Sequence, residues 1–109
     1  MGITKSDLFT AEQNELARYA KVLAHPARIA IIDHLLKSNV CINSDLVQEL
    51  GLAQATISQH LKELKLSGII QGTVEGNAMC YCLDYQVWKE IQQLFDGMFD
   101  KLQPEGSCC

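Results

Sequence analysis

Apolar side chains recur every three to four residues over the first third of the chain, a spacing typical of helices. Thr10 and Gln13 have the form of a capping box, which predicts a helix over residues 11–24. The residue before a proline avoids the α region, so the His25-Pro26 step ends this helix, and Pro26 suits the first position of a second helix over residues 26–37. The second helix is apolar on most sides, which predicts that it is the central element of the core.

A helix-turn-helix is predicted to follow. Ser44 caps a short third helix, and Gly51 is well placed as its C-terminal stop. Two residues later a fourth helix begins, from about residue 54 to residue 67, and Gly68 ends it. Its expected buried seam, spaced i, i+4 and i+7, is Ile57, Leu61 and Leu64.

Two short strands are predicted next, over residues 69–74 and 78–83, with Glu75-Gly76-Asn77 supplying the turn between them. A hairpin that follows the second helix of a helix-turn-helix is a wing. Alternation along the second strand places Cys80 and Cys82 on one face, opposite Met79, Tyr81 and Leu83.

A long final helix is expected over residues 84–102, and its apolar stripe is broader than one small domain needs. We therefore expect this stripe to meet a second copy of the chain. The last residues contain Gly and Pro without periodicity, which is typical of a flexible tail. The predicted fold is mainly α with a small β-hairpin, a winged helix-turn-helix: residues 1–102 form a DNA-binding and dimerisation domain, and residues 103–109 form a flexible tail that contains cysteines.

The net charge of −4 seems unsuited to a protein that binds nucleic acid, but the acidic residues lie mostly outside the middle of the chain. Residues 21–65 hold five basic and four acidic residues, a net charge of +1, whereas the remainder holds four basic and nine acidic residues, a net charge of −5. The chain shows neither an apolar run of membrane-spanning length nor a secretory signal at its start, so we expect a cytoplasmic protein. Its five cysteines should then be reduced, as small apolar residues or as reactive ligands.

The face of the fourth helix opposite its seam has the chemistry of a DNA-reading surface. The outward and flanking residues are small, polar or basic, namely Gln54, Ala55, Thr56, Ser58, Gln59 and Lys62. A Gln side chain can pair with adenine through two hydrogen bonds, and Lys62 can hold a phosphate. Asn77, in the turn of the wing, is a further candidate contact. The alternative is a face that is only solvated.

Three segments carry a specific resemblance, which covers about residues 15–100. They are Leu23-Ala24-His25-Pro26-Ala27-Arg28-Ile29, Leu52-Ala53-Gln54-Ala55-Thr56-Ile57-Ser58-Gln59-His60-Leu61 and the wing from Glu75 to Leu83. In this order they resemble the ArsR/SmtB family of bacterial repressors. The resemblance implies a homodimer joined through its first and last helices, with both recognition helices entering successive major grooves of an imperfect palindrome. Two positions depart from the family pattern: Ala53 stands where a capping serine is common, and Glu75 stands where a basic residue would grip phosphate.

The resemblance also implies an effector that releases the repressor from DNA. A zinc site on the last helix would need histidines, and that helix has none. Arsenic-responsive members carry Cys-x-Cys-Asp-Leu at the start of the third helix, where this chain has Cys41 and, in place of a second thiol, Asn43. We therefore expect As(III) or Sb(III) to be bound by three thiolates, those of Cys41, Cys108 and Cys109.

Two other interpretations of the thiols stay open. Cys80 and Cys82, or the tail thiols, would serve a redox- or persulfide-sensing repressor. Alternatively, Cys41 is only a small buried residue, the tail pair has no signalling role, and Cys80 and Cys82 fill the outer face of the wing.

Two further classes of function compete with a DNA-binding regulator. A thiol enzyme needs a cysteine beside a base or an anion-binding loop, and no cysteine here precedes a Gly-rich or Arg-bearing loop that opens a helix. We therefore expect the protein not to be an enzyme. A winged-helix module that binds proteins and has lost DNA binding is the second alternative, which the acidic overall charge favours.

Overall fold

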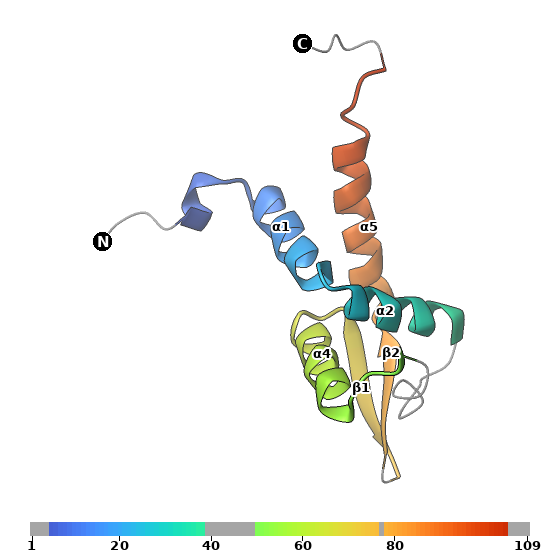
Figure 1. Ribbon diagram of the computed structural model, residues 1–109. Helices are drawn as coiled ribbons and strands as arrows, with labels where there is room; N and C mark the ends of the chain where they lie inside the picture. The colour runs from blue at the N-terminus through green and yellow to red at the C-terminus, as the bar shows by residue number, and fades with distance from the viewer. Residues whose placement is uncertain (1–4, 39–49, 77, 105–109) are drawn as a thin grey trace.

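A row of helices precedes a β-hairpin, and one more helix follows it (Figure 1). This computed structural model describes residues 5–38, 50–76 and 78–104. The predicted third helix, from Ser44, lies outside the described residues, and the helix labels therefore run from α2 to α4. The elements are the 3-10 helix η1 (Lys5–Leu8), α1 (Ala11–Leu23), α2 (Pro26–Ser38), α4 (Gln54–Leu66), β1 (Ile70–Glu75), β2 (Ala78–Leu83) and α5 (Tyr85–Phe99).

The start of α1 has the predicted capping box. The backbone N–H of Gln13 donates to Thr10 Oγ1 at 3.0 Å, and the backbone N–H of Thr10 donates to Gln13 Oε1 at 3.0 Å. At the next junction the carbonyl oxygen of His25 accepts from the backbone N–H groups of Arg28 and Ile29, at 2.9 and 3.1 Å. His25 therefore opens α2, as the His25-Pro26 step predicts.

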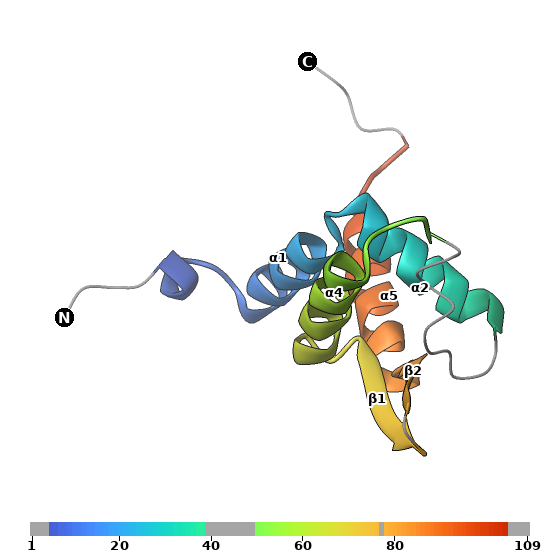
Figure 2. The same cartoon turned by 60° about the horizontal axis from the view of Figure 1, so that its bottom comes forward.

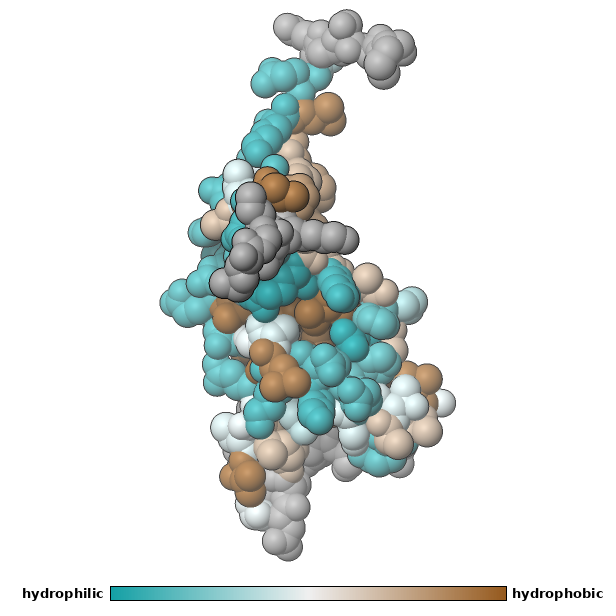
Figure 3. All heavy atoms as spheres, turned by 90° about the vertical axis from the view of Figure 1, so that its left-hand side faces the viewer, coloured by the Kyte–Doolittle hydropathy of each residue, from teal (hydrophilic) through white to brown (hydrophobic). Residues whose placement is uncertain are grey.

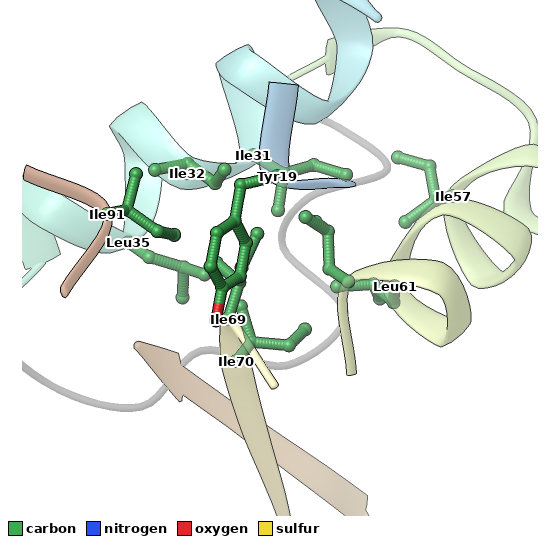
Figure 4. Close-up of a cluster of buried hydrophobic side chains, with 10 residues drawn as sticks. Tyr19, Ile31, Ile32, Leu35, Ile57, Leu61, Ile69, Ile70 and Ile91 are labelled. Carbon is green, nitrogen blue, oxygen red and sulfur yellow. The ribbon is translucent and has the colours of Figure 1, made fainter. Parts of the chain in front are cut away.

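The central position of α2 is confirmed, because it packs against α1, α4 and β2. Its residues Ile31, Ile32 and Leu35 are buried, and side chains from every other helix of the body and from β1 surround them (Figure 4). Burying apolar area in this way is the main favourable contribution to folding. The core therefore fixes α4 and the hairpin against one common helix.

The predicted seam of α4 is also confirmed, since Ile57, Leu61 and Leu64 are all buried. The helix ends at Leu66, and Gly68 then adopts the left-handed region at φ +87°, where glycine carries no steric penalty. The backbone N–H of Ile69 returns to the carbonyl oxygen of Leu64 at 3.1 Å. This turn leads the chain directly into β1.

The two strands form an antiparallel hairpin whose register runs from Ile70 opposite Leu83 to Glu75 opposite Ala78. Paired residues share a face, so Cys80 lies on the face of Thr73 and Cys82 on the face of Gln71. The expectation that these cysteines fill an outer face is wrong for Cys80, which is buried with 8% of its surface exposed, whereas Cys82 is half-buried.

The last helix, α5, is shorter than the predicted span of residues 84–102. It begins at Tyr85, where the backbone N–H of Val87 donates to the capping Asp84 Oδ1 at 3.2 Å, and it ends at Phe99. Beyond Phe99 the chain turns, and the backbone N–H groups of Asp100 and Lys101 donate to the carbonyl oxygens of Asp96 and Met98 at 2.8 and 3.3 Å. Ile91 is buried in the core, but the stripe continues outward to Met98 and Phe99, which are exposed.

The amino-terminal half of α1 and the carboxyl-terminal half of α5 extend beyond the core on the side opposite the wing (Figures 1 and 2). Both therefore present surface that their own chain does not cover. Within the described ranges, the helices are too short or too polar to cross a membrane.

The two faces of α4 allow a matched test of this packing. Leu64→Ala should lower the free energy of unfolding by about 2–5 kcal/mol, because Leu64 is fully buried and the substitution leaves a cavity. Leu66→Ala, the same substitution on the same helix where 73% of the side chain is exposed, should change it by less than about 0.5 kcal/mol. Urea denaturation followed by circular dichroism measures both, and equal losses would contradict the described orientation of α4.

Candidate nucleic-acid interface

The outer face of α4 presents every candidate DNA contact that lies within the described residues. These exposed residues are Gln54, Ala55, Thr56, Ser58, Gln59 and Lys62. The seventh candidate, Asn77, lies outside the described residues. The exposure expected from the helical spacing is thus confirmed on α4, while contact with DNA itself stays a prediction.

Polar side chains on this face are linked along the helix. Gln54 Nε2 donates to Ser58 Oγ at 3.3 Å, and Gln59 Nε2 donates to Glu63 Oε1 at 3.2 Å. Both bonds are exposed, so they exchange readily with water and each contributes little to stability. A base edge that offers a donor and an acceptor can therefore replace them at small cost.

The surface around α4 is mainly hydrophilic. Figure 3 views the molecule from the side on which α4 lies and shows mostly polar groups there, interrupted by a few apolar ones. Lys62 and Lys65 lie on the second half of the helix, beside Glu63. Two cations on the exposed half of a helix are suited to phosphate contacts that hold the protein in register on a duplex.

The wing lies directly beside this helix, because β1 packs against α4. Gly72 of β1 lies close to side chains of both elements: a Cβ atom at this position would lie 3.2 Å from Met79 Sδ, 3.2 Å from Tyr81 Cε1 and 3.4 Å from Lys65 Nζ. The missing side chain lets Met79 and Tyr81 close over the strand. The hairpin is therefore held next to α4 as a neighbouring element.

The start of α4 departs from the usual cap. Ala53 has the extended backbone of an N-cap residue, with φ −63° and ψ 148°, but provides no side-chain hydrogen bond. The first backbone N–H groups of a helix lack partners within the helix and carry a partial positive charge. A phosphate placed at this end of α4 could accept hydrogen bonds from these backbone N–H groups, because the side chain of Ala53 does not occupy them.

Two arginines of the preceding helices donate hydrogen bonds to α4 and to its C-cap residue. Arg28 Nε donates to His60 Nδ1 at 3.0 Å, and Arg18 Nη1 donates to the carbonyl oxygen of Ser67 at 3.4 Å. Burial lowers the pKa of His60 below its ordinary value of 6.5, and Arg28 and His25 lower it further. The sequence analysis assigned Arg28 to a motif but did not foresee its bond to His60, since the two residues are 32 positions apart.

The described thiols do not make a metal site. Cys80 and Cys82 lie on β2, and the described parts of the chain contain no group of three or more His, Cys, Asp or Glu side chains that could hold a metal ion. The predicted ligands Cys41, Cys108 and Cys109 all lie outside the described residues. The thiolate site for As(III) or Sb(III) therefore stays a prediction.

A groove of about 950 Å³ separates α1 from α5. Its apolar lining includes Leu16, Leu94 and Met98, and Glu12 and Lys101 lie at its polar positions. Phe99 and Leu102, close by in sequence, are 65% and 83% exposed. An apolar surface of this kind on two adjoining helices is typical of a protein–protein contact.

The exposed polar face of α4 and the hairpin beside it have the arrangement of the recognition helix and wing of a winged helix-turn-helix, the architecture of many transcriptional regulators. The family model described as "Bacterial regulatory protein, arsR family" matches residues 25–71. The arsenical resistance operon repressor of Staphylococcus xylosus is 32% identical over 82 residues, which cover 75% of this chain and 78% of that protein. The chain belongs to the ArsR/SmtB family of transcriptional regulators.

Other curated relatives are HTH-type transcriptional regulators of mycobacteria, identical at 36–41% of the matched positions. The matches span between 46% and 65% of the length of these relatives, so the chain corresponds to about half to two thirds of each. The relatives are regulators of transcription rather than enzymes. They agree in class with the protein that the sequence analysis predicts.

Solved structures confirm the fold class. The transcriptional repressor BigR from Xylella fastidiosa has a TM-score of 0.66 and 26% identity, with 96% of this chain and 100% of that chain covered. A homodimeric winged helix-turn-helix DNA-binding domain from Mycobacterium bovis has a TM-score of 0.64 and 21% identity, with 100% and 99% covered. The predicted mainly α fold with a small hairpin is therefore correct.

Proposed function

We propose that this regulator is a homodimeric repressor that reads an imperfect palindromic operator with α4. The observation that carries the proposal is the exposed row of amide, hydroxyl and amino groups on α4, opposite a fully buried seam. The similarity to a repressor of an arsenical resistance operon supports it. A protein that represses bacterial genes in this way acts in the cytoplasm.

Each part of the face has its own role in the proposal. Gln54 and Gln59 read base edges in the major groove, where a carboxamide matches adenine. Lys62 holds a phosphate and so contributes affinity without sequence preference. Thr56 and Ser58 bind base edges or phosphates through their hydroxyl groups, Ala55 allows close approach, and Asn77 of the wing binds the adjoining backbone.

Two substitutions on α4 test these roles. The wild-type protein first selects a duplex from a random-sequence library, and fluorescence anisotropy then measures the affinity of each variant for that duplex. Lys62→Ala should weaken binding to all duplexes and reduce the slope of log affinity against log salt by about 1. Gln59→Ala should instead lose about 1–3 kcal/mol of discrimination at one base pair. Lys37→Ala, which removes an exposed lysine of α2 paired with Asp33, is the control and should change neither quantity.

A protein-interaction module without DNA binding is the competing function, and the same titration addresses it. Specific binding to DNA weakens steeply with salt, because bound lysines release counterions from the phosphates. A wild-type protein that enriches no duplex from the library, or binds without salt dependence, would rule out the proposed operator reading and favour the module.

The second copy binds through α1 and α5 in this proposal. The groove between these helices and the exposed side chains of Met98 and Phe99 supply apolar surface that one chain leaves uncovered. The similar domain from Mycobacterium bovis is homodimeric, which supports the proposal. A two-fold dimer presents two copies of α4, and two half-sites of an imperfect palindrome match that symmetry.

A charge placed on this surface tests the dimer. Phe99→Lys should shift the protein from dimer to monomer at micromolar concentration, since a buried unpaired ammonium disfavours the interface strongly. Val74→Lys, at a side chain of β1 that is equally exposed, should leave the mass unchanged. Sedimentation equilibrium measures both, and an unchanged dimer in Phe99→Lys would place the interface elsewhere.

We infer that the effector is As(III) or Sb(III), bound by the thiolates of Cys41, Cys108 and Cys109. Three soft thiolates are the donor set that such a centre prefers. Residues 103–109, which the sequence predicts as a tail beyond the domain of residues 1–102, supply two of them. The alternative effectors are an oxidant or a persulfide. The burial of Cys80 disfavours that thiol as their target, because reaction requires an accessible thiolate, whereas Cys82 is only half-buried.

The response of DNA binding to arsenite distinguishes the metalloid effector from the oxidant and persulfide alternatives. Arsenite should release the reduced wild-type protein from its selected duplex, and the triple variant Cys41→Ser/Cys108→Ser/Cys109→Ser should stay bound. Cys82→Ser is the matched control and should respond like the wild type. Release that persists with Cys108 and Cys109 both changed to Ser would remove the tail from the site, and release by peroxide or persulfide alone would favour the redox alternative.

A further inference from the structure

One arginine joins α4 to the corner between α1 and α2. Arg28 of α2 donates from Nε to Nδ1 of His60 on α4 at 3.0 Å, and from Nη1 to the carbonyl oxygen of Val22 on α1 at 3.1 Å. The ring of His25 lies 5.7 Å from the ring of His60. Both hydrogen bonds of Arg28 are partly buried. A single guanidinium thus contacts the two helices on either side of its own.

The chemistry of this contact fixes the protonation state of His60. A guanidinium only donates hydrogen bonds and stays charged at all ordinary pH values. Nδ1 of His60 must therefore carry a lone pair, which places the proton of the neutral ring on Nε2. Lysine has no planar fork and cannot direct one donor to each of two fixed acceptors in the same way.

His60 is also well placed to affect DNA binding. It follows Gln59 on α4 and lies two residues before Lys62, both of which face outward, while its own ring turns inward to Arg28. A change in the angle or stability of α4 would therefore move the proposed contacts without removing any of them. When only a fraction of molecules holds the competent geometry, the apparent affinity falls by that fraction.

We propose that Arg28 and His60 are positioning residues that hold α4 in the geometry that binds DNA. The proposal rests on the proposed reading of DNA by α4, and neither residue contacts the duplex itself. Arg28 also couples α4 to the end of α1, the helix proposed to meet the second copy. The pair thus links the DNA-reading helix to the dimerising part of the chain.

Protonation of His60 opens this contact. A proton on Nδ1 removes the acceptor and places a second cation beside Arg28. Burial lowers the pKa of His60 most, and Arg28 of α2 and His25, the residue before α2, lower it further. On its own helix, Glu63 lies one turn further and accepts from Gln59. The pKa of His60 in the folded protein is below its ordinary value of 6.5. The contribution of neutral His60 to the stability of the fold is therefore complete above pH 6.5 and is lost as the pH falls through the folded-state pKa.

The first test needs no DNA. An NMR titration of the full chain should show that the pKa of His60 rises toward its ordinary value in Arg28→Met, because the variant removes a neighbouring cation. In Arg28→Lys, amide hydrogen exchange should become faster in α4 than in the wild type. Lys21→Met, at an exposed lysine of α1, is the matched control and should change neither. An unchanged His60 pKa in Arg28→Met would overturn the proposal.

The second test measures affinity for the selected duplex. At about pH 7.5, His60→Leu should weaken binding about tenfold, whereas His60→Asn should stay within about twofold of wild type, because the amide oxygen can replace Nδ1 as the acceptor for Arg28. As the pH is lowered from about 7.5 through the pKa of His60 that the NMR titration gives, the wild type should weaken relative to His60→Asn, which does not titrate. A purely space-filling role for His60 would not produce this pH-dependent difference.

The outcomes separate the two proposals. If the wild-type protein selects no duplex, the proposed function is contradicted, and so is the role of Arg28 and His60 in DNA affinity. A wild-type protein that binds, with His60→Leu equal to it at every pH and with unchanged exchange in α4, would overturn the positioning role alone. Loss of binding in both His60→Leu and Arg28→Lys, with circular dichroism unchanged, would support it.

Discussion

The enclosure of α2 is the constraint on which the other elements depend. Ile31, Ile32 and Leu35 on its inner face are covered from three directions, by α1, by α4 and by the base of the hairpin. Interiors packed to the density of organic crystals deform little, so these elements are held at fixed angles to one another. A reading surface that spans a helix and a hairpin needs this rigidity, because base contacts depend on ångström-scale placement.

The helix α4, which the core holds in place, also carries the candidate DNA contacts. On α4 the buried seam and the polar face are separated by half a turn, and the boundary between them is occupied by His60, which is half-buried. The polar face gains its orientation from apolar contacts on the other side, and from Arg18 and Arg28, which bond to the end and to the middle of the helix. Affinity for DNA and stability of the fold are therefore not independent properties in this chain.

Much of this architecture could be predicted from local patterns. The capping box at Thr10, the proline at the start of α2 and the seam of α4 each depend on residues a few positions apart, and all three are confirmed. The end of α5 was predicted three residues too late, because apolar spacing continues to Leu102 after the helical backbone has stopped at Phe99. The burial of Cys80 and the Arg28–His60 bond depend on how distant elements pack, which periodicity does not encode. The thiolate site involves residues outside those described and stays a prediction.

Gly72 shows how the wing constrains sequence change at a position with no proposed contact to DNA. Any other residue there would place a methyl group or more between Met79 and Tyr81, at distances of 3.2 Å that few Cβ contacts tolerate. The neighbours would have to give by a few tenths of an ångström, which the flexible ends of Met79 and Lys65 allow more easily than the ring of Tyr81. During evolutionary drift a side chain gained at position 72 would therefore need a matching change in the packing of Met79 or Tyr81, whereas a new side chain on the outer face of α4 would need only an altered operator.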